Sequence, residues 1–217
     1  MNRAVIVCGA KIKDYEFVSS FFMEGDFFIY CDSGLIHEDR FLSKSDTKAG
    51  LIIGDFDSHQ RPERDVEIIE LPTVKDDTDS IYAIKEAISR GYKDILIVGA
   101  IGDRFDHSLV NVYALMLIND LGVSGKIVDD YSEMTLVDNR IPVQIDSKWR
   151  YFSLIAISGT VSGVTIKNAK YNLDNATINP KFQYAISNEV AGDEPAKVSV
   201  EEGVLLLIKD RSFYPLI

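Results

Sequence analysis

The chain has 217 residues, enough to bury a substantial core in one large domain or two modest ones. Its composition, 46% hydrophobic and 26% charged, is ordinary for a globular protein and excludes a disordered chain. The 34 Asp and Glu residues outnumber the 23 Lys and Arg residues, and the resulting charge of −11 would repel nucleic acids and anionic membranes. A polyanionic substrate would therefore need a metal ion to screen its charge.

The N-terminal segment does not have the pattern of an export signal, because the apolar run Ala4–Cys8 is only a strand long and charged residues follow it. The longest uncharged stretch, residues 151–166, is too short and too interrupted by glycine to cross a bilayer. Cys8 and Cys31 each end an apolar run, which favours two buried free thiols over a disulfide. These features predict a cytoplasmic protein.

From residue 1 to about 137, short β-rich runs alternate with helical ones, as in parallel strands joined by crossover helices. Ser80–Arg90 has one apolar helical face, and Gly91 follows it as a stop signal. His107–Leu121 is apolar almost all round, which predicts a buried helix. The predicted strands are Ala4–Cys8, Phe27–Cys31, Leu51–Ile53, Val66–Leu71, Asp94–Gly99 and Lys126–Val128.

After about residue 140 the helical spacing disappears, and short strand candidates are separated by turn residues. Glu201–Gly203 predicts a tight reversal into the last strand. We therefore expect an α/β domain over residues 1–138, with a mostly parallel sheet and flanking helices, and an all-β sandwich domain over residues 139–217. The predicted strands of the second domain are Trp149–Ile157, Gly163–Lys167, Ala176–Ile178, Phe182–Ile186, Lys197–Val200 and Val204–Lys209.

Three short acidic clusters follow predicted strands, namely Gly54–Ser58, Lys75–Asp79 and Gly102–His107. In an open α/β sheet the loops after the strands converge at one edge, and ligands bind there. Carboxylates at such an edge bind hard cations, which in turn hold phosphates. Because the chain lacks a P-loop motif, the clusters predict a magnesium–nucleotide site of another kind.

Each acidic cluster also has a simpler structural interpretation. Asp55 and Asp57, two residues apart in an extended segment, could reach one metal ion or could form a solvated turn. Thr78 or Asp79 could cap the helix that follows. Capping does not explain the additional carboxylate of Asp76, because crowded carboxylates repel one another unless a cation lies among them.

Gly99 and Gly102 bracket a turn between a strand and a helix. Glycine lets the backbone approach a phosphate closely, and a helix N-terminus offers N–H groups to it. Arg104 could bind a phosphate through two nitrogen atoms, or could form a structural ion pair with Asp103 or Asp106.

The three clusters, with the third continued to Asn111, resemble the ordered motifs of thiamine pyrophosphokinases. Gly163–Ile166, Lys170–Leu173 and Ile186–Glu189 are similar to that family's substrate-binding sandwich, so the resemblance covers nearly the whole chain. It implies transfer of the β,γ-pyrophosphoryl group of ATP to the hydroxyl of thiamine, with release of AMP and a requirement for Mg²⁺. It also implies a homodimer in which each thiamine lies between the α/β domain of one subunit and the sandwich of the other.

The resemblance assigns site residues position by position. The catalytic acids would be Asp55, Asp57, Asp76, Asp79 and Asp106, of which Asp55, Asp57 and Asp79 would hold the metal. The ATP site would include Asp32, Gly34, Ser58, Thr78, Gly99, Gly102, Arg104, His107 and Asn111. Ser187 and Asn188 would recognise thiamine, although their tripeptide with Glu189 is also typical of a polar turn. Asp77 occupies a variable position and is not assigned.

Other functions also fit these residues. The acceptor could be another heterocyclic alcohol, such as a hydroxymethylpterin, and Asp55 and Asp57 could serve a Mg²⁺-dependent phosphohydrolase. The chain could also be a non-catalytic sensor of thiamine or nucleotide. Retention of the acidic positions argues against a sensor, because a sensor needs affinity but no alignment of metal and phosphate.

Overall fold

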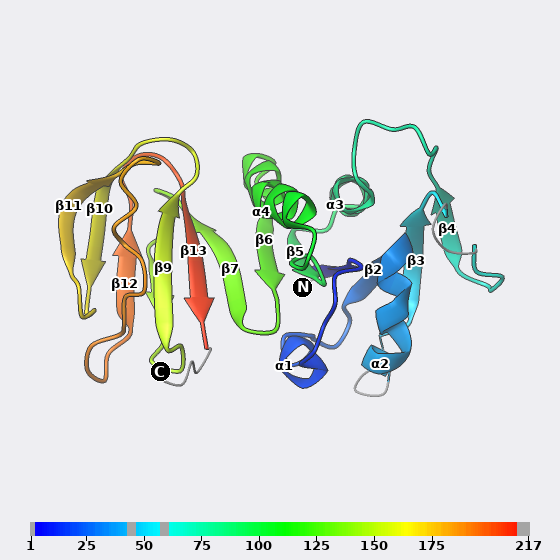
Figure 1. The fold of residues 1–217 in the computed structure, drawn as a ribbon, viewed down its shortest axis with the longest axis horizontal. Coiled ribbons are helices and arrows are strands. Elements are labelled where there is room, and N and C mark those ends of the chain that lie inside the picture. The colour runs from blue at the N-terminus through cyan, green and yellow to red at the C-terminus, as the bar shows by residue number, and fades with distance from the viewer. Residues whose placement is uncertain (1–2, 43–46, 57–60, 212–217) are drawn as a thin grey trace. The chain divides into compact units, whose positions relative to one another are not determined.

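The computed structural model describes residues 3–42, 47–56 and 61–211. The chain divides into two compact units, residues 1–130 and 131–217 (Figure 1). The sequence predicted the boundary after residue 138 instead. The difference arises because residues 132–137 form a strand that pairs antiparallel with the last strand of the second unit.

The first unit contains six parallel strands in the spatial order β4-β3-β2-β1-β5-β6. This confirms the predicted parallel sheet with flanking helices. The strands are β1 (Arg3–Val7), β2 (Phe27–Cys31), β3 (Ala49–Gly54), β4 (Glu67–Glu70), β5 (Asp94–Val98) and β6 (Ser124–Val128). The helices are α1 (Tyr15–Ser19), the 3₁₀ helix η1 (Asp32–His37), α2 (Glu38–Leu42), α3 (Asp79–Ser89) and α4 (Phe105–Asp120).

Helices cover both faces of this sheet, with α1 and α2 on one side and α3 and α4 on the other (Figure 1). Val18 and Phe41 belong to a buried cluster with Phe28, Tyr30 and Val98 of the sheet. Burial of each such side chain stabilises the fold by about 1.5–3 kcal/mol. This cluster covers one face of the central strands, and α3 contributes the buried Ala83, Ile84 and Ala87 to the packing of the sheet.

The prediction of a buried helix is wrong for α4. Its buried residues include the polar Ser108 and Asn111, whereas Phe105, Leu109 and Tyr113 are exposed by 75%, 43% and 50%. An apolar sequence on all sides does not reveal which side packs, because buried polar groups are tolerated where they are hydrogen-bonded. The helix thus buries the hydrogen-bonded Ser108 and Asn111 together with Ala114, Leu115 and Ile118, and it leaves other apolar residues uncovered.

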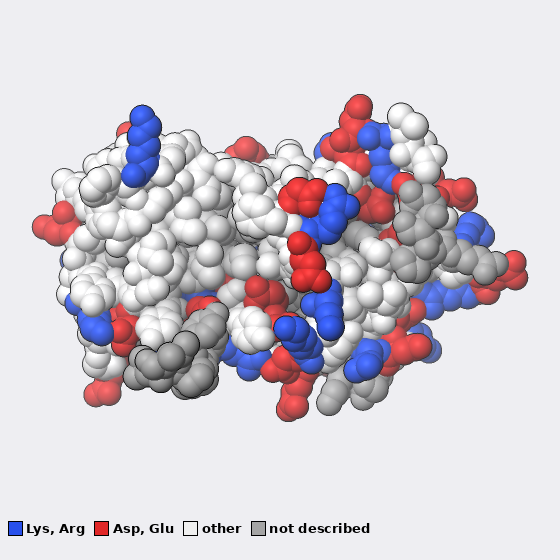
Figure 2. Space-filling view, viewed as in Figure 1, with Lys and Arg blue, Asp and Glu red and all other residues white. Residues whose placement is uncertain are grey.

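The second unit consists of two antiparallel sheets, in the orders β7-β13-β9 and β11-β10-β12-β8. The predicted all-β architecture is confirmed. On β9, Phe152, Leu154 and Ala156 are buried and alternate with less buried residues. On the face drawn in Figure 2, the surface over β9 to β11 is largely uncharged. The strands are β7 (Ser132–Val137), β8 (Val143–Ile145), β9 (Tyr151–Ala156), β10 (Val161–Lys167), β11 (Leu173–Ile178), β12 (Ala196–Ser199) and β13 (Leu205–Asp210).

One local prediction in this unit is wrong. Phe182–Ile186 is not a strand, and the side chain of Gln183, instead of the backbone of a neighbouring strand, bonds to both backbone groups of Ala156. Glu201–Gly203 lies between β12 and β13, which belong to different sheets, so the predicted reversal connects two sheets and not the two strands of a hairpin. The strands β7 and β8 were not predicted.

None of the helices in the described part of the chain combines the length and the apolar character needed to cross a membrane.

Candidate active site

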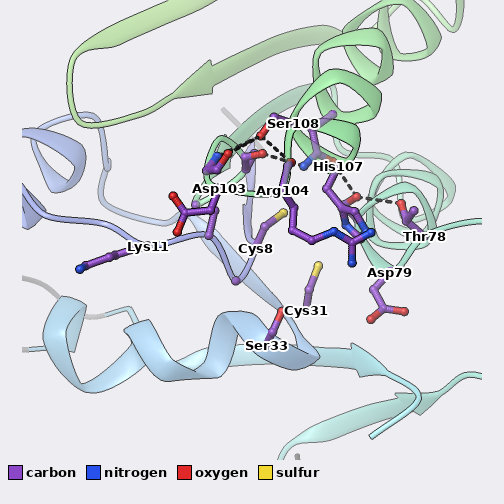
Figure 3. A pocket seen from close by; sticks show the side chains of 17 residues that line it. Cys8, Lys11, Cys31, Ser33, Thr78, Asp79, Asp103, Arg104, His107 and Ser108 are labelled. Atoms are coloured by element: carbon purple, nitrogen blue, oxygen red, sulfur yellow. Dashed lines mark hydrogen bonds between the residues drawn. The ribbon is translucent and has the colours of Figure 1, made fainter. Parts of the chain in front are cut away.

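A cavity of about 460 Å³ lies at the carboxyl ends of β1, β2 and β5, next to the first turns of α3 and α4 (Figure 3). This is the sheet edge that the sequence predicted, and the volume suits a small-molecule ligand. Seven predicted site residues line the cavity, namely Thr78, Asp79, Gly99, Gly102, Arg104, His107 and Asn111.

The loop between β5 and α4 forms one wall of the cavity. Gly99 has a φ of +62°, and a Cβ atom there would lie 2.3 Å from the carbonyl oxygen of Cys8. Glycine is therefore required for the loop to pass over the end of β1. Ser108, which the sequence analysis did not assign, accepts a hydrogen bond from Gly102 N at 3.0 Å and donates one to Arg104 O at 3.0 Å. The loop is thus fixed to the first turn of α4.

A chain of hydrogen bonds joins α3, α4 and this loop. Ser80 Oγ donates to Asn111 Oδ1 at 2.8 Å, and Asn111 Nδ2 donates to Ala100 O at 2.8 Å. Thr78 is the N-cap of α3, and its Oγ1 lies 3.0 Å from Ser80 Oγ. The capping interpretation therefore holds for Thr78. Thr78 and Asn111 help to shape the cavity, because their polar groups are already engaged with neighbouring parts of the protein.

Asp55 and Asp79 come together around one cation, the ammonium group of Lys75. Lys75 Nζ lies 2.6 Å from Asp55 Oδ2 as a hydrogen-bonded pair, and 2.7 Å from Asp79 Oδ1 without hydrogen-bond alignment. Burial alone would lower the pKa of Lys75, but the two carboxylates together outweigh it and raise that pKa. Asp55 follows β3 and Asp79 opens α3, so the sheet edge brings together two clusters that lie 24 residues apart.

This pair of carboxylates suits a magnesium ion, which proteins hold through one or two carboxylates together with substrate phosphates. Within residues 3–42, 47–56 and 61–211, no three His, Cys, Asp or Glu side chains converge as a complete metal cage. The third predicted ligand, Asp57, and the predicted ATP residue Ser58 lie outside the described residues. Asp76 is exposed, and Asp77 forms an ion pair with Lys85 at 2.6 Å.

Arg104 and Asp106 form an exposed ion pair at 2.5 Å at the start of α4. The hydrogen bond from Arg104 lowers the pKa of Asp106 to about 2. The sequence allowed Arg104 either to bind a phosphate or to form a structural ion pair, and in the structure it forms the ion pair with Asp106. Solvent screens such a pair strongly, so the guanidinium group can exchange its partner for a phosphate at little cost.

The predicted residues Asp32 and Gly34 lie beside the cavity but do not line it. Asp32 is buried directly after β2, and a Cβ atom on Gly34 would lie 2.0 Å from Val7 O. Gly34 therefore serves the close packing of η1 against β1. Their neighbours Cys31 and Ser33 line the cavity instead.

Cys8 and Cys31 end adjacent strands, and their sulfur atoms point toward one another at the cavity (Figure 3). Both are free thiols, as predicted. A hydrogen bond with Cys8, together with burial, raises the pKa of the Cys31 thiol. The sequence indicated that these cysteines are buried, but it did not show that they contribute to the site.

The two predicted thiamine residues lie in the second unit. Ser187 is exposed with a φ of +56°. Asn188 is only 2% exposed, and its side chain joins two turns. Asn188 Oδ1 accepts hydrogen bonds from Tyr171 N and Glu189 N at 3.0 and 2.9 Å, and Nδ2 donates to Tyr171 O at 2.7 Å. Asn188 therefore has one N–H left for any ligand.

Two family models match the chain. Residues 18–124 match the thiamin pyrophosphokinase catalytic domain, and residues 138–205 match the thiamin pyrophosphokinase vitamin B1 binding domain. The chain belongs to the thiamine pyrophosphokinase family. The thiamine pyrophosphokinase of Bacillus subtilis (strain 168) is 28% identical over 172 residues, which cover 74% of this chain and 80% of that protein.

Solved structures of thiamine pyrophosphokinases have the same fold. The crystal structure from Bacillus subtilis superimposes with a TM-score of 0.84 at 24% identity, covering 98% of this chain and 100% of that chain. The structure from Geobacillus thermodenitrificans gives a TM-score of 0.82 at 26% identity, covering 99% and 100%. The order of the two matched models along the chain agrees with the division into an α/β unit and an all-β unit.

Within this thiamine pyrophosphokinase fold, three polar residues that the sequence analysis did not assign contribute to the site. Lys75 joins the two acids, Ser80 connects α3 to α4, and Ser108 fixes the loop that carries Arg104. Ser108 follows the loop that Gly99 and Gly102 bracket, and a serine at such a place could have been recognised from the sequence as a residue that fixes the loop. Lys75 and Ser80 each have one partner that is distant in sequence, Asp55 and Asn111, and local patterns could not have identified these contacts.

Proposed function

We propose that this chain transfers the pyrophosphoryl group of ATP to the hydroxyl oxygen of thiamine and releases AMP. In this reaction the thiamine oxygen bonds to the β-phosphorus, the bond from that phosphorus to the α,β-bridging oxygen breaks, and the hydroxyl proton is lost. The observation that carries the proposal is the convergence of Asp55 and Asp79 on one cation beside the cavity. Family membership supports the choice of substrates.

Asp55 and Asp79 would hold Mg²⁺, together with Asp57 if that residue completes the set. When bound, this ion neutralises charge that develops on the transferred phosphates. The remaining phosphate charge would be neutralised by the protein at the start of α4. There Arg104 and the N-terminus of α4, a 16-residue helix, provide positive charge. Catalysis would rest on positioning and on electrostatics, because phosphoryl transfer needs little covalent help.

The rigidity of the cavity supports this mechanism. The network from Thr78 through Ser80 and Asn111 to Ala100 fixes α3 and α4 relative to the loop between them. Asp79 and Arg104 are held at the first turns of these two helices, and both line the same cavity. A site with fixed charges loses little energy to rearrangement during the reaction.

The proposed acceptor site includes the second unit, through Ser187 and the exposed surface near it. We also propose a cytoplasmic homodimer, as the family resemblance implies. The uncovered apolar residues Phe105, Leu109 and Tyr113 of α4 support this, since exposed apolar patches commonly mark protein interfaces.

The test is a product assay with ATP, Mg²⁺ and thiamine, in which nucleotides and thiamine esters are separated by chromatography. We expect AMP and thiamine pyrophosphate in equal amounts, and no AMP without thiamine. Formation of ADP, or phosphate release without an acceptor, would contradict the proposal. Replacing thiamine with a hydroxymethylpterin tests the alternative acceptor directly.

A pair of acidic variants connects this activity to the site. Asp79→Asn should lower kcat by about 10²–10³-fold, because it removes one charge from the proposed metal pair. Asp77→Asn is the matched control, since Asp77 pairs with the half-exposed Lys85 outside the cavity and should leave kcat unchanged. Equal activity in Asp79→Asn and wild type would remove Asp79 from the mechanism.

A further inference from the structure

Lys75 lies between the two acids that the proposed function assigns to the metal. Its ammonium group is 2.6 Å from Asp55 Oδ2 and 2.7 Å from Asp79 Oδ1. The three side chains are largely enclosed, with exposures of 11% for Lys75, 13% for Asp55 and 25% for Asp79. Helix capping does not account for a lysine at this point, and the family resemblance, whose second motif begins at Lys75, assigned no role to it.

Enclosed carboxylates in close proximity repel one another, because little water is present to screen them. A single cation between them removes this repulsion and fixes both side chains. Lys75 provides that cation from within the chain, since it precedes Asp79 by four residues and reaches across to Asp55. The acid pair is therefore assembled without any bound ion.

A divalent cation held between the two acids would compete with Lys75 Nζ, which now contacts one oxygen atom of each carboxylate. Two carboxylates and one ammonium leave a net charge of −1, whereas two carboxylates and a divalent cation are neutral. A divalent ion and the ammonium group at the same point would repel each other at short range. Entry of the ion therefore requires Lys75 to withdraw.

We propose that Lys75 is a resident counter-ion that holds Asp55 and Asp79 in place and is displaced when the divalent ion enters. This inference rests on the proposed function, because that function assigns the metal to the same acids. Lys75 is a positioning residue in this role. It preassembles the site and, by competing with the ion, weakens metal binding in the absence of nucleotide.

The same segment provides a matched control. Lys85 pairs with Asp77 at 2.6 Å, but these side chains are 50% and 31% exposed, and neither residue lines the cavity. Lys75→Met and Lys85→Met remove the same charge and keep an unbranched side chain of similar length. Lys75→Arg keeps the charge.

The experiment measures Mn²⁺ binding without nucleotide, from the electron paramagnetic resonance signal of the free ion, and thermal unfolding in EDTA and in Mg²⁺. Lys75→Met should bind Mn²⁺ about tenfold more tightly than wild type, because its competitor is gone. The same variant should unfold at a lower temperature in EDTA and recover in Mg²⁺. Lys85→Met and Lys75→Arg should bind Mn²⁺ as wild type does.

Equal or weaker Mn²⁺ binding by Lys75→Met would overturn the proposal. So would a variant that stays unfolded in saturating Mg²⁺, since the ion should then replace the missing ammonium group. Neither readout uses ATP or thiamine. If the wild-type protein formed no AMP, the proposed function would be refuted, but the Mn²⁺-binding result would still stand. If the wild-type protein formed AMP normally and Lys75→Met bound Mn²⁺ as wild type does, only the role of Lys75 would be refuted.

Discussion

In the first unit, Asp79, Arg104 and His107 line a cavity at the edge of a parallel sheet, whereas in the second unit Asn188 is buried and hydrogen-bonded to backbone groups. The two regions also differ in charge. Charged side chains are scattered over the first unit in Figure 2, and four of them, Lys11, Asp79, Asp103 and Arg104, line its cavity, while the surface over β9 to β11 is largely uncharged.

This difference shows what a matching motif does and does not establish. A polar residue at a family position can contact a ligand, or it can hold the backbone that does so. Asp55 and Asp79 surround a shared cation, and we propose that they belong to the first class, whereas Asn188, Thr78 and Asn111 make contacts with neighbouring parts of the protein. Substitutions at Asn188, Ser187 and Arg104 test this distinction.

The largest effect is expected from Asn188→Ala. The substitution removes the hydrogen-bond partners of Tyr171 N, Tyr171 O and Glu189 N. Because such groups are costly to leave unpaired, the free energy of unfolding should fall by about 2–4 kcal/mol. Urea denaturation measures this change, and Ser187→Ala is the control, since Ser187 is exposed and should change stability by less than about 0.5 kcal/mol.

Calorimetric titration with thiamine completes this comparison. Ser187→Ala should weaken thiamine binding if the exposed serine contacts the ligand. An Asn188→Ala protein with wild-type stability and no thiamine affinity would contradict the structural role given to Asn188. It would place a polar recognition group in the second unit, as the sequence predicted.

A smaller effect is expected from Arg104→Ala. Arg104 lines the cavity and forms an ion pair with the exposed Asp106. Loss of a charged contact to phosphate should raise the KM for ATP about tenfold and leave the melting temperature unchanged. Steady-state kinetics over ATP concentration test this, and Arg140→Ala, which removes an exposed arginine of the second unit, is the control. A large loss of stability without a change in KM would make Arg104 a structural residue.

Much of the fold followed from sequence patterns. The buried parallel strands are continuous apolar runs, and the predicted limits of Phe27–Cys31 agree with β2. Patterns failed where distant partners decide the structure. Phe182–Ile186 alternates like a strand, but the amide of Gln183 takes the backbone bonds of Ala156. The strand β7 was missed because it contains Glu133, whose charge is balanced by Lys209 on the paired strand β13.

The site was predictable to a similar degree. Positions after strand ends identified Asp55 and Asp79, because the topology of a parallel sheet brings such loops to one edge. Lys75 could not be assigned, since its importance arises only from a contact across 20 residues. The family resemblance assigned Asn111 to the ATP site, and spacing could not reveal that its amide is also hydrogen-bonded to Ser80 and to Ala100 O.

The smallest predicted effect concerns pH and belongs wholly to the first unit, because all three histidines of the sequence, His37, His59 and His107, precede residue 131. His37 is buried, its Nε2 donates to Ala10 O at 2.9 Å, and its Nδ1 accepts from the Tyr15 hydroxyl at 2.6 Å. A carbonyl oxygen can only accept, which assigns the proton to Nε2. Burial lowers the pKa of His37, against the opposing effects of Ala10 O and Asp130.

The neutral ring is thus favoured in the folded protein, and an unfolded chain binds the proton more readily. The stability from His37 is therefore complete above its unfolded pKa, about 6.5, and is lost as pH falls below that value. The slope for one proton is at most about 1.4 kcal/mol per pH unit. Urea unfolding at pH 7.5, 6.5 and 5.5 should show this decline in wild type and in the exposed-site control His107→Gln, and a shallower one in His37→Gln. An unchanged slope in His37→Gln would mean that other groups, such as the acids around the cavity, set the pH response of the first unit.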